Sequence, residues 1–422
     1  MSRISANALQ FSTRLHPKCG HAKDILARDR ARAQKLMSGT QPHGPLVVQE
    51  MCKKDGTQRS QSGQPDSGNS IDVTDAAVTY TCIVKLGQPG QPFKLLIDTG
   101  DCLIIAFPHF KLTRSSGSSN TWVGADKEYK PSSSSKNTRK SVNVSYGSGS
   151  FTGTEMIDRC ELSPALVIDQ QSIGVASSAQ GFQGVDGILG IGPVDLTQGT
   201  VNGMGNIPTV TGNLKSEGKI PKESIAISYQ PTTGADMANG EMTFGSENSS
   251  KYTGDITYVP ITSTSPANKY WGVDQSMTYG KNMNIMSKCA GIVDTGTTLL
   301  LLSSGAYKKY MEATGAKMDE STGLLCVTKE QFSKMENLCF KMGSTTFEMT
   351  PNAQIWPRSL NAMMGGKTDV IYLVVADMGD MGGSGLEFIN GFAFLQRFYS
   401  VYDTTNCRVG LANTPHTMDG TN

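Results

Sequence analysis

Short runs of alternating apolar and polar residues recur along most of the chain, for example VTYTCIVKL at 78–86, KSVNVSYG at 140–147, DITYVPIT at 255–262 and FYSVYDTT at 398–405. Glycine, proline, asparagine and serine separate these runs, a combination typical of short β-strands joined by turns. Helical periodicity is confined to 23–37, 305–315 and 328–338. The pattern predicts an all-β chain rather than one in which strands and helices alternate.

The same short motif occurs twice, each time directly after an apolar strand. LLIDTG at 95–100 presents Asp98, and GIVDTGTT at 291–298 presents Asp294. A second apolar run containing glycine follows each motif, VDGILGIG at 185–192 and EFINGFAF at 387–394. A single Asp-Thr-Gly usually marks only a turn. Two copies in the same context indicate an internal duplication, with two β lobes that each present one carboxylate.

Two carboxylates that face each other cannot both ionise easily, so they share one proton over a wide pH range. Such a pair can act as base and acid together: one carboxylate removes a proton from a water molecule held between them, and the other protonates a substrate carbonyl oxygen. This chemistry requires no metal, cofactor or covalent intermediate. Asp98 and Asp294 are therefore the candidate catalytic residues.

The 422 residues are enough for two domains and carry a net charge of +1, which gives no reason to expect nucleic acid or an anionic membrane as a partner. The charge is unevenly distributed, because residues 1–60 hold 11 Lys and Arg against 4 Asp and Glu, which leaves 27 against 33 in the remainder. The first part is either a solvated basic tail or a basic prosegment that lies on an acidic body.

No run of the sequence is long enough for a membrane span, and the first twenty residues lack the apolar stretch of a signal peptide. Nothing in the printed sequence directs the chain out of the cytosol, although a truncated first exon would look the same. The nine cysteines include no CxxC pair, so they form no zinc or redox motif. Cys326 and Cys339 flank a helical stretch, either as a disulfide or as two unpaired thiols.

Several longer motifs extend the pattern: SSNTWVG at 118–124, VSYGSGSFTGTE at 144–155, DGILGIGPVDLT at 186–197, AQIWPR at 353–358 and RFYSVYDTTNCRVGLA at 397–412. With the two Asp-Thr-Gly motifs, they make the chain resemble the pepsin family of aspartic proteases from about residue 72 to residue 413, and within that family the secreted basidiomycete enzymes of the polyporopepsin type. The resemblance implies a bilobal pepsin-like fold with an active-site cleft between two duplicated β lobes.

The resemblance also implies the organisation and activity of the chain. Residues 1–70 would be a basic propeptide-like segment, 71–262 the N-terminal lobe and 263–422 the C-terminal lobe. The expected activity is that of a secreted endopeptidase, with a vacuolar location as the second possibility. It would be made as a zymogen and would cleave extended polypeptides between hydrophobic residues at acid pH. We expect a monomer without cofactor or metal that binds pepstatin-like inhibitors and neither nucleic acid nor a membrane.

Residue by residue, the resemblance assigns three groups of site residues. Asp98 and Asp294 form the dyad. The residues that support the dyad would be Thr99, Gly100, Ser118, Thr295, Gly296 and Thr297. Substrate would contact Tyr146 at the tip of a hairpin flap, with Gly147, Ser148, Ile188 and Thr298.

Other protein classes share parts of this pattern. The actin, sugar-kinase and heat-shock ATPase fold also has two Asp-x-Gly-Thr turns, but it needs long helical crossovers that this sequence lacks. The glycine-rich YGSGSFTG at 146–153 opens no helix, so it lacks the usual phosphate site. The remaining alternative is a pepsin-like protein that has lost catalysis and serves in binding. Asp98, Asp294 and Tyr146 are all present, which argues against that alternative.

The first motif departs from the family at one point. The family reads Asp-Thr-Gly-Ser-Ser without a break, whereas here 17 residues, DCLIIAFPHFKLTRSSG at 101–117, separate Gly100 from Ser118. Such a run inside a buried turn is expected to break packing, remove a hydrogen bond to Asp98 and add Asp101 as a third carboxylate. We interpret it as a retained intron translated in frame, which would leave the printed chain catalytically impaired or inactive.

Overall fold

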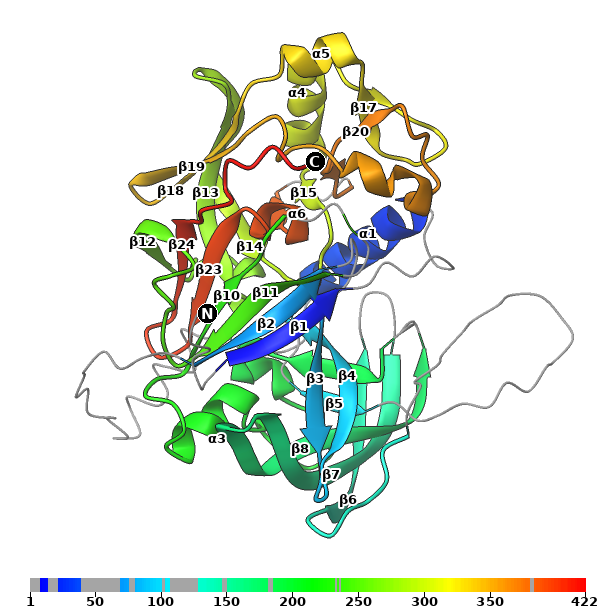
Figure 1. The fold of residues 1–422 in the computed structure, drawn as a ribbon, viewed down its shortest axis with the longest axis vertical. Coiled ribbons are helices and arrows are strands. Elements are labelled where there is room, and N and C mark those ends of the chain that lie inside the picture. The colour runs from blue at the N-terminus through cyan, green and yellow to red at the C-terminus, as the bar shows by residue number, and fades with distance from the viewer. Residues whose placement is uncertain are drawn as a thin grey trace, which may run out of the picture.

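The computed structural model of the protein describes residues 8–13, 22–38, 69–75, 80–100, 103–106, 128–145, 150–180, 185–231, 234, 237–379 and 383–422. Figure 1 shows two β lobes with a band of strands between them, so the expected all-β, bilobal architecture is confirmed. The described helices are α1 (Ala22–Ser38), α3 (Val210–Ser216), α4 (Ser304–Thr314), α5 (Lys329–Ser333) and α6 (Phe392–Leu395), with 3₁₀ turns at Val194–Thr197, Ala267–Lys269 and Arg358–Met364.

One sheet of 14 described strands passes through the lower lobe and the middle of the molecule (Figure 1), in the order β12-β24-β23-β10-β11-β1-β2-β3-β4-β9-β5-β8-β7-β6. Its strands are β1 (Ala8–Thr13), β2 (Asn69–Asp75), β3 (Tyr80–Leu86), β4 (Gln91–Asp98), β5 (Ile104–Ala106), β6 (Lys136–Ser145), β7 (Ser150–Ser163), β8 (Leu166–Gln180), β9 (Gly187–Gly190), β10 (Ser224–Ser228), β11 (Met237–Phe244), β12 (Thr253–Pro260), β23 (Phe398–Asp403) and β24 (Arg408–Asn413).

The upper lobe contains a seven-stranded sheet in the order β19-β18-β13-β14-β22-β15-β21 and a small sheet in the order β16-β17-β20. Their strands are β13 (Gly272–Tyr279), β14 (Met283–Val293), β15 (Leu300–Leu302), β16 (Lys317–Met318), β17 (Leu325–Val327), β18 (Leu338–Met342), β19 (Thr345–Met349), β20 (Ile371–Tyr372), β21 (Val375–Asp377) and β22 (Phe388–Asn390). Cys326 lies in β17 and Cys339 in β18, and both thiols are free, so the disulfide considered for this pair is not formed.

The two lobes repeat one arrangement of four strands. In the lower lobe β4 runs parallel to β9, which pairs antiparallel with β5, and β5 runs parallel to β8. In the upper lobe β14, β22, β15 and β21 make the same three pairings in the same directions. The glycine-containing runs at 185–192 and 387–394 supply β9 and β22. The duplication inferred from the two motifs is therefore present in the strand topology.

The strand β5 comes from the 17-residue run that interrupts the first motif. Its residue Ile104 pairs with Leu189 of β9 and with Ile173 of β8. The side chains of Leu103, Ile104 and Ala106 are almost completely buried. The broken packing expected of this run is therefore not found in residues 103–106, which complete the sheet of the lower lobe. The remainder of the run, with Ser118, lies outside the described residues.

The N-terminal segment is built into the molecule at two places. Strand β1 pairs with β11 on one side and with β2 and β3 on the other (Figure 1). Helix α1 lies between the lobes and buries one face, made of Ala22, Ile25, Leu26, Asp29, Ala33 and Leu36. Their spacing of three or four residues gives an amphipathic helix. Each fully buried leucine or isoleucine contributes about 1.5–3 kcal/mol, so the apolar face holds the helix in place.

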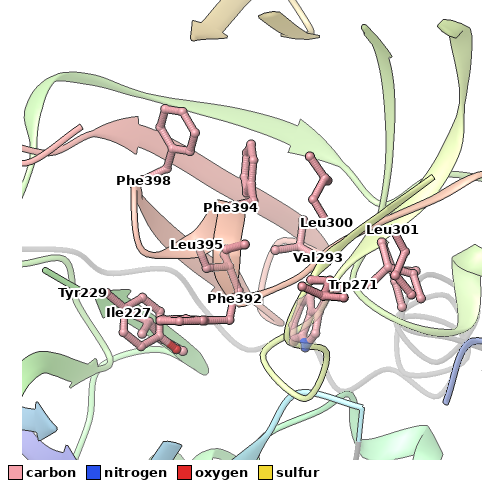
Figure 2. Packing of buried hydrophobic residues seen from close by; sticks show 14 of the residues in the cluster. Ile227, Tyr229, Trp271, Val293, Leu300, Leu301, Phe392, Phe394, Leu395 and Phe398 are labelled. Atoms are coloured by element: carbon pink, nitrogen blue, oxygen red, sulfur yellow. The ribbon is translucent and has the colours of Figure 1, made fainter. Parts of the chain in front are cut away.

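The largest apolar cluster of the described residues extends through both lobes, and part of it lies behind the second motif. Figure 2 shows Trp271, Val293 and Leu300 beside the aromatic residues that follow β22, among them Phe392 and Phe394. The rings of Phe394 and Phe398 are 4.7 Å apart between centroids. A core packed this densely fixes the end of β14, and with it the position of Asp294, because small displacements would open cavities. None of the described helices is long and apolar enough to cross a membrane.

Candidate active site

The two Asp-Thr-Gly turns meet where the lobes join and are tied together through their threonines. The backbone amide of Thr99 donates to the hydroxyl oxygen of Thr295 at 3.1 Å, and the amide of Thr295 donates to the hydroxyl oxygen of Thr99 at 3.0 Å. Both threonines are buried. Buried amides need such partners, and this reciprocal pair fixes one turn against the other. The threonines predicted to support the dyad are thus in place.

Each aspartate is held by the turn that carries it. The amide of Gly100 donates to Asp98 Oδ1 at 2.8 Å, and the amide of Gly296 donates to Asp294 Oδ1 at 3.2 Å. Thr297 adds a hydroxyl bond of 2.7 Å to Asp294 Oδ2, as predicted. The side chains of Asp98 and Asp294 are both about 98% buried, so their carboxyl groups face the junction of the lobes and little solvent.

A guanidinium from α1 lies directly on this pair. Arg32 Nε contacts Asp294 Oδ2 at 2.6 Å, and its Nη1 contacts Asp98 Oδ2 at 2.9 Å. The Nη2 atom contacts Asp294 Oδ1 at 2.9 Å and also Asp98 Oδ1. One planar cation with its donors in a fixed fork thus engages all four carboxylate oxygens, which arginine can do and lysine cannot.

The glycines of the two turns leave the space that the guanidinium occupies. A Cβ atom added at Gly100 or at Gly296 would collide with Arg32 Nη2. Neither glycine needs an unusual backbone conformation for this, since both are absent from the positive-φ residues. A side chain at either position would have to displace the guanidinium from the carboxylates.

The electrostatics of the site follow from this contact. Burial alone would raise the pKa of the Asp294 carboxyl, but the charge of Arg32 and the bonds from Arg32, Thr297 and Gly296 hold that pKa below its usual value. Burial alone would lower the pKa of Arg32, and the charges of Asp294 and Asp98 raise it instead. With α1 in place, the guanidinium of Arg32 therefore favours the ionised form of Asp294.

Two neighbours of Arg32 anchor the helix to the upper lobe. Asp29 is completely buried and accepts hydrogen bonds from the amides of Thr298, at 3.1 Å, and Leu299, at 2.8 Å. Burial raises the pKa of Asp29 to about 6, against the lowering effect of those amides and of Arg28 and Arg32. Arg30 contacts Asp377 at the end of β21.

The predicted substrate-binding residues have different outcomes. Tyr146, Gly147 and Ser148 lie outside the described residues, but β6 and β7 form the hairpin that leads to them, with Ser145 paired to Ser150.

The other two predicted substrate-binding residues are described and buried. Ile188 has no exposed surface and packs in a second apolar cluster with Leu103 and Phe151, so it lines no open pocket while α1 is bound. Thr298 is close to the dyad, where its amide is occupied by Asp29 and its buried hydroxyl has no partner.

The sequence did not single out Arg32, Asp29 or Arg30, which are the residues of α1 that contact the dyad and the upper lobe. The sequence predicts a basic helix at 23–37, outside the two lobes, but it does not indicate which residues of that helix contact the lobes. Periodicity places Asp29 on the apolar face, where a carboxylate is rare. That position was the one local sign of a specific contact. Among the described residues, no group of three or more His, Cys, Asp and Glu is arranged to hold a metal ion.

Comparisons with known proteins agree with this geometry. Residues 79–414 match the family model described as eukaryotic aspartyl protease. The chain is 52% identical to polyporopepsin of Irpex lacteus over 84% of its own length and the whole of that protein. It is 32% identical to rhizopuspepsin-1 of Rhizopus niveus, over 71% of this chain and 74% of that one. The crystal structure of the aspartic proteinase from Irpex lacteus superposes with a TM-score of 0.78 at 50% identity, covering 84% of this chain and all of that one.

Proposed function

Because the chain belongs to the eukaryotic aspartyl protease family, whose members hydrolyse peptide bonds, we propose that Asp98 and Asp294 are its catalytic dyad and act on extended polypeptides at acid pH. The observation that carries this proposal is the joining of the two turns by reciprocal threonine bonds, with both carboxyl groups open to one shared partner. A binding protein without catalysis has no need of this arrangement.

The chemistry follows once Arg32 has left. Two buried carboxyl groups that face each other without a cation retain one proton between them, because two like charges in contact are strongly disfavoured. The ionised member removes a proton from a bound water, whose oxygen attacks the peptide carbonyl carbon, and the protonated member donates to the carbonyl oxygen. The hydroxyls of Thr297 and Thr99 both donate to Asp294, which favours its ionised form.

Substrate recognition is proposed to use the flap and the backbone around the dyad. An extended peptide bound between the lobes would pair with the backbone of Gly147 and Ser148 and contact Tyr146, while alternate side chains enter pockets. The amide of Thr298, now occupied by Asp29, becomes available when α1 leaves. Hydrophobic residues are expected on both sides of the cleaved bond, and Ile188 is expected to contact the one that precedes it.

Residues 1–70 are proposed to form the inhibitory prosegment of a zymogen. Arg32 occupies the dyad and α1 covers it, so neither water nor peptide can reach the carboxylates. Acid weakens this contact. The pKa of Asp294 is lowered when α1 is bound, so docking is stabilised above the pKa of the free group and loses that stability as the pH falls through the lowered value. We further propose a secreted monomer, with the vacuole as the alternative location.

The test of the proposed activity is hydrolysis of a protein substrate at about pH 3–5, where one shared proton is expected on the dyad, with pepstatin as the control. Pepstatin carries a hydroxyl that replaces the bridging water, so it should abolish cleavage. A folded, prosegment-free chain that also lacks residues 101–117, yet binds no pepstatin and cuts no peptide, would overturn the assignment and favour the binding-protein alternative.

The latency proposal has its own test. Arg32→Met removes the cation from two buried carboxylates, and loss of one partner of a buried ion pair costs roughly 3–5 kcal/mol. We expect the prosegment of this variant to leave at least about a hundredfold faster near neutral pH, followed as pepstatin binding to the intact chain. Lys23→Met, which removes the same charge from an exposed position of the same helix, should keep normal latency. Unchanged latency in Arg32→Met would contradict the proposal.

A further inference from the structure

Besides the dyad, α1 occupies a second polar site on the upper lobe. Arg30 Nε donates to the main-chain oxygen of Asp377 at 2.8 Å, and its Nη2 lies 3.5 Å from Asp377 Oδ2. Two oxygens of one residue thus receive one guanidinium. Arg30 and Arg32 are two positions apart in α1, so the same helix presents one cation to the dyad and another to Asp377.

The orientation of Asp377 does not depend on α1. Its Oδ1 accepts a hydrogen bond from the Ser304 hydroxyl at 2.8 Å and another from the amide of Gly379 at 3.0 Å. Both donors belong to the upper lobe. When the helix leaves, Oδ1 stays held, while Oδ2 and the main-chain oxygen lose the contacts with Arg30. A preorganised acceptor for a cation is therefore left behind.

The strand topology places this acceptor beside the path of a substrate. Asp377 ends β21, which runs parallel to β15 with Leu302 opposite Asp377. Strand β15 begins six residues after Asp294, so Asp377 lies on the strand next to the one that follows the second turn. Its side chain is 24% exposed even under α1. A peptide that replaces α1 over the dyad would pass this carboxylate.

We propose that Asp377 is a specificity-determining residue of the mature enzyme and binds a lysine or arginine side chain of the substrate a few residues from the cleaved bond. Arg30 of the prosegment occupies that position in the zymogen. The inference rests on the proposed function, since it concerns the same cleft, and it adds a substrate class to it: peptides with a basic residue next to the hydrophobic pair.

The experiment compares matched peptides with the prosegment-free enzyme that also lacks residues 101–117, the form in which we expect activity. Each peptide carries lysine or the uncharged norleucine at one of four positions on either side of the bond, and kcat/KM is measured for both. A partly exposed ion pair predicts a lysine-to-norleucine ratio of about three to five at one position. Asp377→Asn retains an oxygen for Ser304 and Gly379, and it should bring that ratio to about one. Asp377→Lys should reverse the preference toward glutamate at the same position.

Asp369→Asn is the matched control, because it removes an exposed carboxylate from the same lobe. It should retain the wild-type ratio. A wild-type enzyme that never prefers lysine at any of the eight positions, or a preference that persists in Asp377→Asn, would overturn the inference.

A second measurement needs neither catalysis nor a variant. Peptides with a reduced, uncleavable bond, in lysine and norleucine versions, are titrated onto the protein without its prosegment at low and high salt. The lysine version should bind about three to five times more tightly at low salt and lose that advantage at high salt. Equal binding of both versions would contradict the role of Asp377. Failure of the proposed hydrolysis alone would appear as binding without cleavage, so the two failures are distinguishable.

Discussion

The strands on either side of Asp98 and those on either side of Asp294 make the same pairings. Each aspartate follows a strand that pairs in parallel with a glycine-containing run, and in each lobe the next strand begins six residues later, at Ile104 and at Leu300. That strand makes the same two pairings in both lobes. The 17-residue run in the first motif therefore does not displace the strand that follows the turn, because its own apolar residues supply β5.

The two motifs differ in sequence three positions after the aspartate. Three positions after Asp294 stands Thr297, whose hydroxyl donates to the carboxylate, whereas three positions after Asp98 the sequence has Asp101. An ionised carboxylate has no proton to donate. Any short apolar run can fill a strand position in a sheet, but the hydrogen bond to a buried carboxylate depends on one side chain. The run is thus compatible with the fold of the lower lobe and unfavourable for its chemistry.

The largest effect is expected from removing either carboxylate. Asp98→Asn and Asp294→Asn each replace a group that must exchange a proton, so kcat should fall by about a thousandfold or more in both cases. Both variants are made in the chain that lacks residues 101–117, activity is measured with a peptide substrate at acid pH, and circular dichroism verifies the fold. Equal losses would show that the two turns serve one dyad despite their different surroundings. A variant with more than about a tenth of normal activity would exclude that residue from the dyad.

Deleting residues 101–117 tests whether this run impairs the chemistry of the first turn. The deletion places Ser118 directly after Gly100. We expect the shortened chain to be at least about a hundredfold more active than the printed chain. Asp101→Ser leaves β5 in place and replaces only the residue that corresponds to Thr297. If this variant recovers most of the activity, the defect lies in one side chain.

Two outcomes of the same experiment would count against the interpretation of the run. A fully active printed chain would show that the run is harmless. Loss of thermal stability on deletion would show that β5 has become necessary to the lower lobe. The retained-intron hypothesis itself is tested on the transcript: messenger RNA that is uniformly unspliced across this junction would contradict it.

Removing the threonine hydroxyl from the second turn should make its chemistry resemble that of the first turn. Thr297→Val preserves the shape of the side chain but deprives Asp294 of a bond of 2.7 Å, and a hydrogen bond to a charged group is worth about 1.5–3 kcal/mol. We expect kcat to fall by about tenfold to a hundredfold. Thr322→Val removes a comparable bond to Asp319, away from the dyad, and should leave kcat unchanged. The same loss in both variants would indicate a general effect on stability.

The smallest expected effect concerns Asp29, whose pKa rises to about 6 when α1 is docked. The docked state therefore binds this proton more tightly than the free prosegment does, and docking gains stability as the pH falls from about 6 to about 4. Asp294 has the opposite sign, so Asp29 delays acid release. Asp29→Asn should abolish this gain, which is of order 2 kcal/mol.

The measurement is hydrogen-exchange protection of the α1 amides across that pH range, in an Asp98→Asn background that does not cut itself. In that background, the chain that retains Asp29 should show α1 protection that rises by roughly thirtyfold toward about pH 4. The chain that also carries Asp29→Asn should not show the rise. Asp24→Asn, an exposed carboxylate of the same helix, is the control. A rise that persists without Asp29 would refute its role.

The duplication was predictable because short sequence motifs encode it. A strand, an Asp-Thr-Gly turn and a second glycine run occur twice, and each element is recognisable from a few neighbouring residues. The all-β class followed from the same alternation. The motif also places the hydroxyls of Thr99, Thr295 and Thr297 beside the two aspartates, where each takes part in a hydrogen bond of the turns.

The contacts of α1 could not be predicted because they join residues far apart in sequence. Arg32 is one of several similar arginines in 22–38, and only the docking of the helix selects it for the dyad. Strand β5 was missed for another reason. The run 101–117 was judged as an interruption of a family pattern, while the register of the sheet admits any apolar residues at the right spacing from Asp98. The free thiols of Cys326 and Cys339 could not be predicted either, because the sequence does not give the distance between two cysteines, on which a disulfide depends.

The place of β1 in the middle of the large sheet has a consequence for the lifetime of the latent state. A cut between residues 38 and 69 breaks the covalent link between α1 and the lobes. The released N-terminal fragment still contains β1, which stays paired with β11 on one side and with β2 and β3 on the other. The cut turns an intramolecular contact into a bound complex, whose dissociation requires a row of strand hydrogen bonds to break and β2 to pair fully with β11. After cleavage, the protein should therefore stay latent until the fragment dissociates. Dilution, which prevents the fragment from binding again, should reveal the half-life of that dissociation.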